Sequence, residues 1–372
     1  MTQFRYFSPV EIRFGFGSRA QLLQALQQMG AKPFFVVDSF LRESVLVRDL
    51  LLQSEVTAQN IFSNVEPNPS LTTVQSIADA ALASGCNALV AIGGGSVMDA
   101  AKAAALAAGT RTPIASFLRG ETPLQGGALP TVAMPTTAGT GSEVTMVSVL
   151  TDTERDIKAP LAHPCLFPRL AIVDPEFTLS VPPQVTAATG MDALSHALEG
   201  YWSVHHQPFC DAFAENAASL VFRHLADAVR NGEDREAREA MALASLMAGL
   251  AFAQPKTAAV HACSYVLTQR YGLSHGAACA LTLDAFVRFN AEEHTLRMDA
   301  FARALGLSCS NALANKIHAL KAEIGMPMSL ADAGIPMDEL DTLVRESFHP
   351  NMLNNPRKVT SGELKELYLS LK

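Results

Sequence analysis

The sequence predicts an α/β domain followed by an all-helical domain. In the first half, short apolar runs alternate with helical patterns, which is typical of βαβ units around a mostly parallel sheet. After Val181-Pro182-Pro183 the β-branched runs almost disappear, and long segments rich in Ala, Leu and Met follow. A chain of 372 residues is also too long for one ordinary core. We therefore expect an α/β domain over residues 1–181 and an all-helical domain over residues 182–372.

Four apolar runs in the first domain are the predicted strands of the sheet. Each run is short and stops at a polar or glycine-containing turn, as the strands of βαβ units do. In chain order the runs cover residues 34–37, 88–92, 131–134 and 170–173. Helical patterns cover residues 21–29, before the first of these strands, and residues 72–83, between the first two.

The second domain is predicted to contain long helices. The segments rich in Ala, Leu and Met cover residues 211–228, 236–252, 276–289, 293–304 and 310–324. In the first domain, the alanine-rich run 100–108 contains Lys102 and is too short to span a membrane, so it is predicted to be a buried helix.

Composition and charge narrow the class of partner. The formal net charge is −8 and no run of Lys or Arg stands out, which argues against a nucleic-acid partner. The N-terminus has no basic start followed by an apolar run, so neither a secretory signal nor a membrane partner is expected. The six cysteines contain no CxxC pair, which suits free thiols in a reducing cytoplasm. Cys263 is expected to lie in the core.

Four residues of the helical domain have the chemistry of a metal site. Asp192 and His196 are four residues apart in GMDALSHALEG, which puts a carboxylate and an imidazole on one helix face. His261 and His275 follow in a second helical region, separated by a break at Gly272. One carboxylate and three imidazoles are a full set of protein ligands for Fe²⁺, Zn²⁺ or another divalent cation. A single His would more often be structural, so the prediction rests on the set.

A glycine-rich turn in the first domain predicts a nucleotide site. Gly93-Gly94-Gly95-Ser96 follows a predicted strand and opens a helix over residues 97–108. Glycines allow close approach to a pyrophosphate, and the free N–H groups of a helix start favour anions. The motif is not GxGxxG, and a simple strand-to-helix turn is the alternative. Asp99 could contact a ribose or the nicotinamide amide with Lys102 in support, or both side chains could be solvated.

Two further elements strengthen the prediction of a dinucleotide cofactor. The stretch PTTAGTGSE over residues 135–143 offers hydroxyl and backbone donors for phosphate oxygens, although it could also be a polar helix-capping loop. Asp38 closes the first predicted strand. A carboxylate there accepts hydrogen bonds from a ribose and repels a 2′-phosphate, which favours NAD(H) over NADP(H). A helix-capping role is the alternative for Asp38.

Taken together, GGGSVMDAAK, PTTAGTGSE, GMDALSHALEG and the two later His elements resemble the iron-containing (group III) alcohol dehydrogenase family over essentially the whole chain. The resemblance implies a Rossmann-like dinucleotide-binding domain, a helical metal-binding domain as in dehydroquinate synthase-like proteins, and a metal in the cleft between them. It also implies hydride transfer between NAD(H) and a small alcohol or aldehyde, and a homodimer in which residues 4–17 of the two chains pair as edge strands.

The resemblance assigns residues to both sites. The implied metal ligands are Asp192, His196, His261 and His275. The implied cofactor contacts are Asp38, Asn68, Gly94, Gly95, Ser96, Asp99, Thr136, Thr137, Thr140, Thr145 and Lys158.

Two positions depart from the pattern of the family. Many members carry a further His four residues after the third ligand, where it can relay a proton, but this chain has Tyr265. Tyr265 could relay a proton or simply pack in its helix. Lys256 precedes His261 by five residues, in a stretch that is glycine-rich or apolar in many relatives. It could direct a cation toward a substrate with an anionic tail, such as a phosphonate, sulfonate or carboxylate, or it could extend into solvent.

Three other functions compete with the predicted one. Maleylacetate reductases would also use a cationic pocket. Glycerol dehydrogenases share the architecture, but their metal sites generally lack one of the four ligands found here. A catalytically silent nucleotide-binding protein would have no need of Asp192 and the three His residues.

Overall fold

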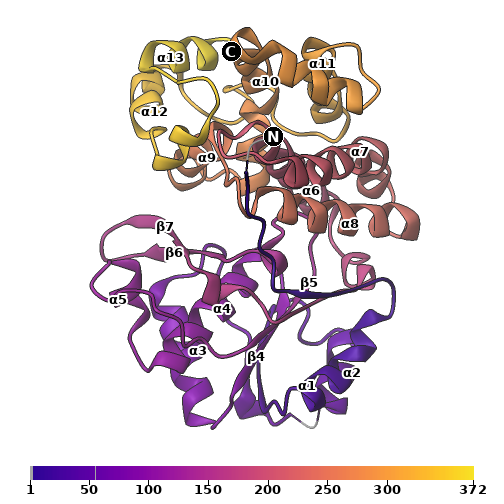
Figure 1. The fold of residues 1–372 in the computed structure, drawn as a ribbon, viewed down its shortest axis with the longest axis vertical. Helices are drawn as coiled ribbons and strands as arrows, with labels where there is room; N and C mark the ends of the chain where they lie inside the picture. The colour runs from indigo at the N-terminus through magenta and orange to yellow at the C-terminus, as the bar shows by residue number, and fades with distance from the viewer. Residues whose placement is uncertain (1–2, 55) are drawn as a thin grey trace. The chain divides into compact units, whose positions relative to one another are not determined.

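The computed structural model describes residues 3–54 and 56–372, and the chain forms two compact units (Figure 1). The α/β unit contains Ser8–Thr137 and Gly141–Leu179. The helical unit contains Ser180–Lys372 together with the N-terminal segment up to Phe7 and the short segment Ala138–Thr140. The division of the chain between residues 181 and 182 stays a prediction, and two short segments from before that point group with the helices. Met1 and Thr2, part of the N-terminus considered for a signal, lie outside the described residues.

A six-stranded parallel sheet forms the centre of the α/β unit, with the order β1-β8-β5-β4-β2-β3. Its strands are β1 (Glu11–Phe14), β2 (Pro33–Val37), β3 (Ile61–Phe62), β4 (Ala88–Gly93), β5 (Thr131–Pro135) and β8 (Leu170–Val173). The four predicted runs became β2, β4, β5 and β8, the inner strands. The edge strand β1 lies within the segment 4–17, which was expected to form edge strands. The other edge strand, β3, was not predicted, because it is short and carries no continuous apolar run.

Helices cover both faces of this sheet. Alternate residues of β4 enter two different cores: Leu89 and Ala91 pack with α3 and α4, whereas Val90 and Ile92 pack with α1 and α2. Continuous apolar strands are therefore required, since neither face meets water. The helices are α1 (Leu22–Gln28), α2 (Val45–Gln53), α3 (Leu71–Ala83), α4 (Gly95–Thr110) and α5 (Ile114–Leu118). An antiparallel hairpin of β6 (Val147–Asp152) and β7 (Ile157–Ala162) completes the unit, with 3₁₀ turns η1 (Ser18–Gln21), η2 (Ala58–Asn60), η3 (Ser142–Val144), η4 (Pro164–Leu166) and η5 (Pro175–Thr178).

The helical unit is organised around one buried helix, α6. Its helices are α6 (Pro183–Trp202), α7 (Pro208–Arg230), α8 (Arg235–Phe252), α9 (Ala259–Gln269), α10 (His275–Ala304), α11 (Ser310–Glu323), α12 (Leu340–Glu346) and α13 (Ser361–Leu369), with 3₁₀ turns η6 (Met337–Glu339) and η7 (Pro350–Asn354). The two predicted helical segments 276–289 and 293–304 both lie in α10, which has a kink at His294, where the backbone angles are non-helical. The gap between the predicted segments ends one residue before this kink.

Close backbone contact holds the start of α10 against α6. A Cβ atom added at Gly276 would lie 1.8 Å from the carbonyl oxygen of Ala188, and one added at Gly190 would lie 2.2 Å from Leu225 Cδ1. Neither position has room for a side chain, which explains glycine inside two helices where it costs about 1 kcal/mol relative to alanine. The close approach brings the first turn of α10, which begins at His275, against the helix that carries Asp192.

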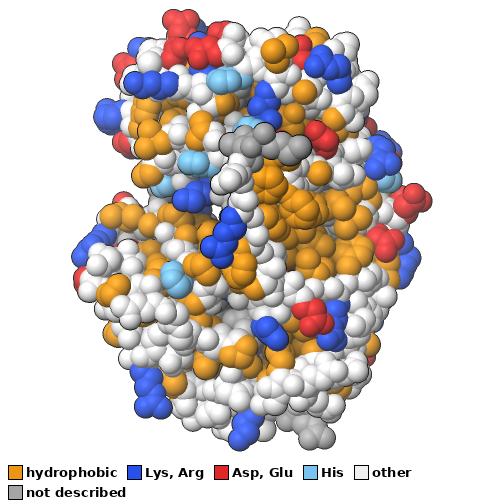
Figure 2. Space-filling view, viewed as in Figure 1, with side chains coloured by type: hydrophobic (Ala, Val, Ile, Leu, Met, Phe, Trp, Pro, Cys, Tyr) orange, Lys and Arg blue, Asp and Glu red, His pale blue; other side chains and the backbone are white. Residues whose placement is uncertain are grey.

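Among the described residues, no helix combines the length and apolar character required to cross a bilayer. On the face drawn in Figure 2, Lys and Arg side chains are scattered among acidic and uncharged residues and form no continuous basic surface.

Candidate active site

The four predicted metal ligands come together inside the helical unit, around one carboxylate oxygen. Asp192 Oδ1 lies 3.6 Å from His196 Nδ1, 3.4 Å from His261 Nε2 and 3.6 Å from His275 Nε2. Asp192 and His196 are one turn apart on α6, His261 lies on α9 and His275 is the first residue of α10. Asp192, His196 and His261 are at most 5% exposed, and His275 is partly exposed.

The atoms that face one another here lack other partners. Asp192 Oδ1, His196 Nδ1 and His261 Nε2 are buried and make no hydrogen bond within the described residues. Buried polar atoms are almost always satisfied, so three such atoms in one place require an explanation. Ligands bound at about 2 Å from a divalent cation would be separated from each other by roughly the spacing seen here. The residues therefore fit a divalent metal ion.

The electrostatics of the cluster suit metal binding. Burial lowers the pKa of His196 to about 4, so that ring is neutral at pH 7 and has a free lone pair. Burial alone would raise the pKa of Asp192, but His196 and His275 outweigh burial and hold that pKa below its usual value. Burial opposes a charge on His261 as well, yet Cys279 and Glu199 raise the pKa of His261 well above its ordinary value. A bound cation would neutralise the same negative charge.

Glu199 is a site residue that the sequence analysis missed. Its side chain is fully buried, and its Oε1 accepts hydrogen bonds from the backbone N–H groups of Val260 (2.6 Å) and His261 (3.3 Å). Its Oε2 is hydrogen-bonded to His261 Nδ1, which leaves Nε2 of that ring facing Asp192. Metal-binding imidazoles commonly donate their second N–H to a carboxylate in this way. The sequence spacing could have indicated this role, since Glu199 lies seven residues after Asp192 and therefore on the same face of the helix.

Cys279 is a second residue that the sequence analysis missed. One ligand atom each from Asp192, His261, His275 and Cys279 lie within 4.8 Å of one another. Cys279 is fully buried and lies on α10, four residues after His275. This group of four differs from the predicted set, because Cys279 stands in place of His196. His196 joins the cluster through Asp192.

Three predicted cofactor residues meet at the start of α4 in the α/β unit. Lys158 Nζ donates to Asn68 Oδ1 (2.7 Å), and the backbone N–H of Asn68 donates to Ser96 Oγ (3.2 Å). Asn68 has a positive φ of 57°, which turns the chain toward α4. Gly94 caps α4 and lies against Thr137, since a Cβ at Gly94 would be 3.3 Å from Thr137 Oγ1. The helix therefore begins inside a frame of polar side chains, as an anion site requires.

Asp99 and Lys102 have structural contacts beneath this turn. Asp99 accepts hydrogen bonds from Ser142 Oγ (2.6 Å) and from the backbone N–H of Val149 (2.8 Å), and it lies 3.2 Å from Lys102 Nζ. Lys102 is 1% exposed and donates to Ser142 Oγ (2.6 Å) and to the Val147 carbonyl oxygen. Lys102 is thus not solvated. Both carboxylate oxygens of Asp99 hold the loop and the hairpin onto α4, and a direct contact of Asp99 with the cofactor stays a prediction.

The other predicted cofactor residues lie at the carboxyl ends of strands or in the loop after β5. Asp38 directly follows β2, and its Oδ1 accepts a hydrogen bond from the backbone N–H of Phe40 (2.9 Å). Thr136 and Thr145 are 2% exposed. Thr140 belongs to the segment that groups with the helical unit. Gly95 is the first residue of α4.

Tyr265 and Lys256 have different surroundings. The Tyr265 ring lies 4.4 Å from the ring of His349. Lys256 is exposed and has a positive φ of 66°. Its backbone N–H donates to the carbonyl oxygen of Phe252 (2.7 Å), and the Phe252 ring stacks on His196 at 4.1 Å. The backbone of Lys256 is therefore hydrogen-bonded to Phe252, the residue that packs on the predicted ligand His196.

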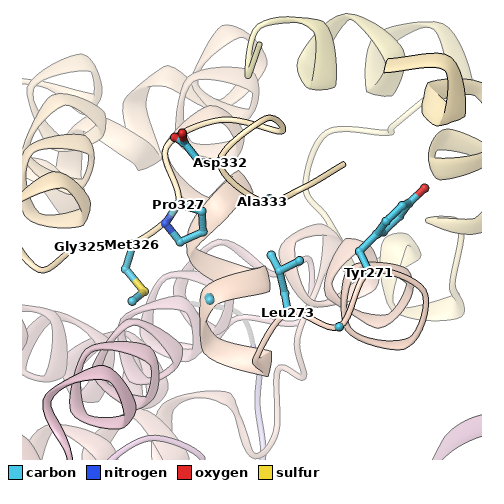
Figure 3. Close-up of a pocket in the computed structure, with 9 residues that line it drawn as sticks. Tyr271, Leu273, Gly325, Met326, Pro327, Asp332 and Ala333 are labelled. Carbon is cyan, nitrogen blue, oxygen red and sulfur yellow. The ribbon is translucent and has the colours of Figure 1, made fainter. Parts of the chain in front are cut away.

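A surface pocket of about 570 Å³ lies elsewhere in the helical unit (Figure 3). Its walls come from the connection between α9 and α10, from α10 and from the segment after α11. The lining residues are Tyr271, Gly272, Leu273, Ala277, Gly325, Met326, Pro327, Asp332 and Ala333. None of the four predicted metal ligands lines it, although the lining residues Leu273 and Ala277 flank His275 in the chain.

Comparison with known proteins matches both units. Residues 9–175 match the sequence model of the iron-containing alcohol dehydrogenases, and residues 186–371 match that of the C-terminal part of the Fe-containing alcohol dehydrogenase family. The chain is 34% identical to long-chain-alcohol dehydrogenase 1 of Geobacillus thermodenitrificans, over 99% of this chain and 96% of that protein. It is 36% identical to the NAD-dependent methanol dehydrogenase of Bacillus methanolicus, over 97% of this chain and 98% of that protein.

A solved structure adds a further likeness. The crystal structure of sulfoacetaldehyde reductase from Bifidobacterium kashiwanohense in complex with NAD⁺ matches with a TM-score of 0.96 and 44% identity, covering 100% of this chain and 99% of that one. These matches confirm the predicted fold class, and iron and NAD(H) fit the family. Because the matches span both units in the expected order, the chain belongs to the iron-containing alcohol dehydrogenase family and is an oxidoreductase.

Proposed function

We propose that the chain holds a divalent metal ion with Asp192, His196, His261 and His275 and uses it to interconvert a small alcohol and its aldehyde with NAD(H). The observation that carries this proposal is the convergence of three imidazole nitrogens on Asp192 Oδ1, at 3.4 to 3.6 Å. Iron is the metal named by the family, and zinc suits the same types of ligand.

The residues of the chain prepare the site for this chemistry. A bound divalent cation supplies a Lewis acid for the charge that develops on the substrate oxygen, and the nicotinamide supplies or accepts the hydride. Asp192 contributes the anionic ligand, and neutral His196 contributes a lone pair. Phe252 covers one face of His196 and excludes water from it. Glu199 fixes the orientation of His261.

For the cofactor, we propose that the pyrophosphate binds at the start of α4. The N–H groups of Gly95 and Ser96 belong to the first turn of a 16-residue helix, whose dipole favours an anion. Lys158 adds a positive charge beside Asn68. Asp38, at the end of β2, is suited to a ribose and supports a preference for NAD(H).

Replacing His196 with Ala tests the metal site. Turnover should fall by about 10²–10³-fold, the scale of losing one group that stabilises transition-state charge, while NAD⁺ affinity should stay close to wild type because the proposed cofactor contacts are elsewhere. Aldehyde-dependent NADH oxidation, NAD⁺ titration and metal content would be measured together. In the wild type, a chelator should abolish turnover and Fe²⁺ should restore it. A His196→Ala enzyme with full metal content and wild-type turnover would refute the ligand set.

Replacing Glu199 with Gln tests the positioning of His261. We expect metal affinity to fall about 10–100-fold, as losses of such outer partners typically do, because the amide provides one acceptor oxygen where the carboxylate provides two. Competition with a chromophoric chelator measures the affinity directly. Glu239→Gln, at an exposed position on α8, is the matched control. Equal affinities in the two variants would show that Glu199 has no part in the metal site.

We also propose that the preferred aldehyde carries an anionic group, such as a sulfonate, phosphonate or carboxylate. Two observations support this class over neutral aldehydes. The exposed Lys256 is tied through its backbone to Phe252, which stacks on His196. The structural relative at 44% identity is described as a sulfoacetaldehyde reductase. A maleylacetate reductase-like activity would use the same cation and is the second candidate.

Replacing Lys256 with Gln tests the substrate class. A hydrogen bond to a charged group contributes about 1.5–3 kcal/mol, so kcat/KM for phosphonoacetaldehyde or succinic semialdehyde should fall about 10–100-fold. The kcat/KM for propanal should not fall, since that substrate has no anion to bind. Glutamine meets the same strain at the positive φ as lysine, and Lys365→Gln on α13 controls for loss of surface charge. Equal losses on propanal and on the anionic aldehydes would exclude the anionic pocket.

We further propose that two chains form a dimer through their N-terminal segments, in the cytoplasm. The strand β1 is an edge of the sheet, and Phe4, Phe7 and Ile12 near it are 53%, 40% and 37% exposed. All six cysteines are free, as a reducing compartment keeps them.

Sedimentation equilibrium tests the dimer and should give twice the chain mass. Ile12→Lys should shift the equilibrium to monomer, whereas Leu296→Lys, on the exposed surface of α10, should not. A wild-type monomer would end this proposal.

A further inference from the structure

Cys279 has surroundings that core packing alone does not explain. Cysteine is among the residues most often buried, so complete burial by itself indicates nothing. The distinguishing observation is that its Sγ lies within 4.8 Å of ligand atoms of Asp192, His261 and His275. Two of those residues carry buried atoms without hydrogen-bond partners among the described residues, namely Asp192 Oδ1 and His261 Nε2. The thiol therefore lies beside the same unsatisfied atoms that indicate a cation.

Helix geometry accounts for this position. α6 provides Asp192 and His196, four residues apart, and α10 provides His275 and Cys279, also four residues apart. Residues at this spacing lie on the same helix face, one turn apart, and their Cβ atoms tilt toward the helix N-terminus. The Cys279 side chain is thus directed back toward the turn that carries His275. The close contact of Gly276 with Ala188 holds that turn against α6.

A second buried cysteine provides the contrast. Cys263 is also fully buried, and it lies only two residues after His261. Its thiol interacts with the hydroxyl groups of Tyr368 and Ser347, whereas the thiol of Cys279 interacts with His261, and Cys263 is absent from the cluster of possible ligands. As the sequence analysis expected, Cys263 belongs to the core. Cys263 and Cys279 are thus equally buried, but of the two only Cys279 faces the possible metal ligands.

We propose that Cys279 is a further metal ligand, which gives this site a thiolate for a thiophilic divalent cation such as Zn²⁺ or Co²⁺. This inference rests on the metal site proposed above and extends it by one residue. On binding, the S–H bond of Cys279 breaks, its electron pair forms the bond from sulfur to the cation, and its proton passes to solvent. Nothing is oxidised or reduced in this step.

The chemical consequence is a choice of metal. An aspartate with three imidazoles suits Fe²⁺ and also Zn²⁺, and adding a thiolate to that set shifts the preference toward Zn²⁺. Removing the thiol should therefore weaken binding of Zn²⁺ and Co²⁺ more than binding of Mn²⁺ or Fe²⁺, which have less affinity for sulfur. We expect the affinity for Zn²⁺ to fall at least about 10-fold, since losing even a hydrogen-bond partner of a metal ligand typically lowers metal affinity about 10–100-fold.

Cobalt substitution gives a readout that does not depend on activity. The purified full-length enzyme would be stripped with a chelator, loaded with Co²⁺ under anaerobic conditions, and examined by absorption spectroscopy. A thiolate bound to Co²⁺ gives an intense near-ultraviolet charge-transfer band, whereas oxygen and nitrogen ligands give only the weak visible bands of the metal. Cys279→Ala is the test variant. Cys263→Ala removes an equally buried sulfur, and so controls for lost packing. Zn²⁺ and Mn²⁺ affinities of all three proteins would be measured by chelator competition.

The expected result is a charge-transfer band in the wild type and in Cys263→Ala that is lost in Cys279→Ala, while the visible cobalt bands remain. The Zn²⁺ affinity of Cys279→Ala should fall and its Mn²⁺ affinity should change little. Visible bands without a charge-transfer band in the wild type would overturn the role of Cys279 and leave the proposed Asp/His site standing. Absence of all cobalt bands in the wild type would refute both. If the charge-transfer band were lost in Cys263→Ala and kept in Cys279→Ala, the sulfur ligand would be Cys263, and the proposal for Cys279 would be wrong.

Discussion

A buried carboxylate surrounded by three imidazoles is the constraint on which the helical unit depends. Asp192 is 2% exposed and its Oδ1 has no hydrogen-bond partner among the described residues. An uncompensated charge in such a place costs several kcal/mol. The imidazoles of His196, His261 and His275 reduce that cost in part, and a divalent cation would remove the rest. The surrounding helices therefore serve to hold ligands that would be unfavourable anywhere else in the fold.

Small residues make that arrangement possible. At Gly276 the backbone of α10 comes so close to Ala188 of α6 that no side chain fits. The alanine-rich surfaces of α6, α8 and α9 in the same core allow similarly close packing. A polar side chain beside the ligands, Glu199, also fixes their arrangement. Glu199 uses both of its carboxylate oxygens on α9, so one side chain fixes both the start of a helix and the direction of a ligand.

The α/β unit solves a different problem, which is to present backbone N–H groups to an anion. β4 ends at glycines and α4 begins at once, so the turn has no side chains that would obstruct a phosphate. Beneath it, Asp99 and buried Lys102 connect the helix to the loop and hairpin through Ser142 and Val149. These two residues were predicted as direct or supporting cofactor contacts, and their observed partners are parts of the protein. Asn68, Ser96 and Lys158 form the polar frame at the surface of the same turn.

Sequence alone predicted the class of the fold, the four inner strands and the family, and it singled out the four proposed ligands, because each is expressed in local patterns: apolar runs, helical spacing and short motifs. It missed β3, since a short edge strand carries no such pattern, and it placed the break in α10 just before His294, the residue with non-helical angles. It also missed Glu199 and Cys279. Only the tertiary structure could show that Glu199 reaches α9, that Cys279 faces the cluster while Cys263 does not, and that Asp99 accepts hydrogen bonds from Ser142 and Val149. These contacts depend on which faces of the helices pack together. That packing is determined by residues that are far apart in the sequence, so local patterns do not reveal it.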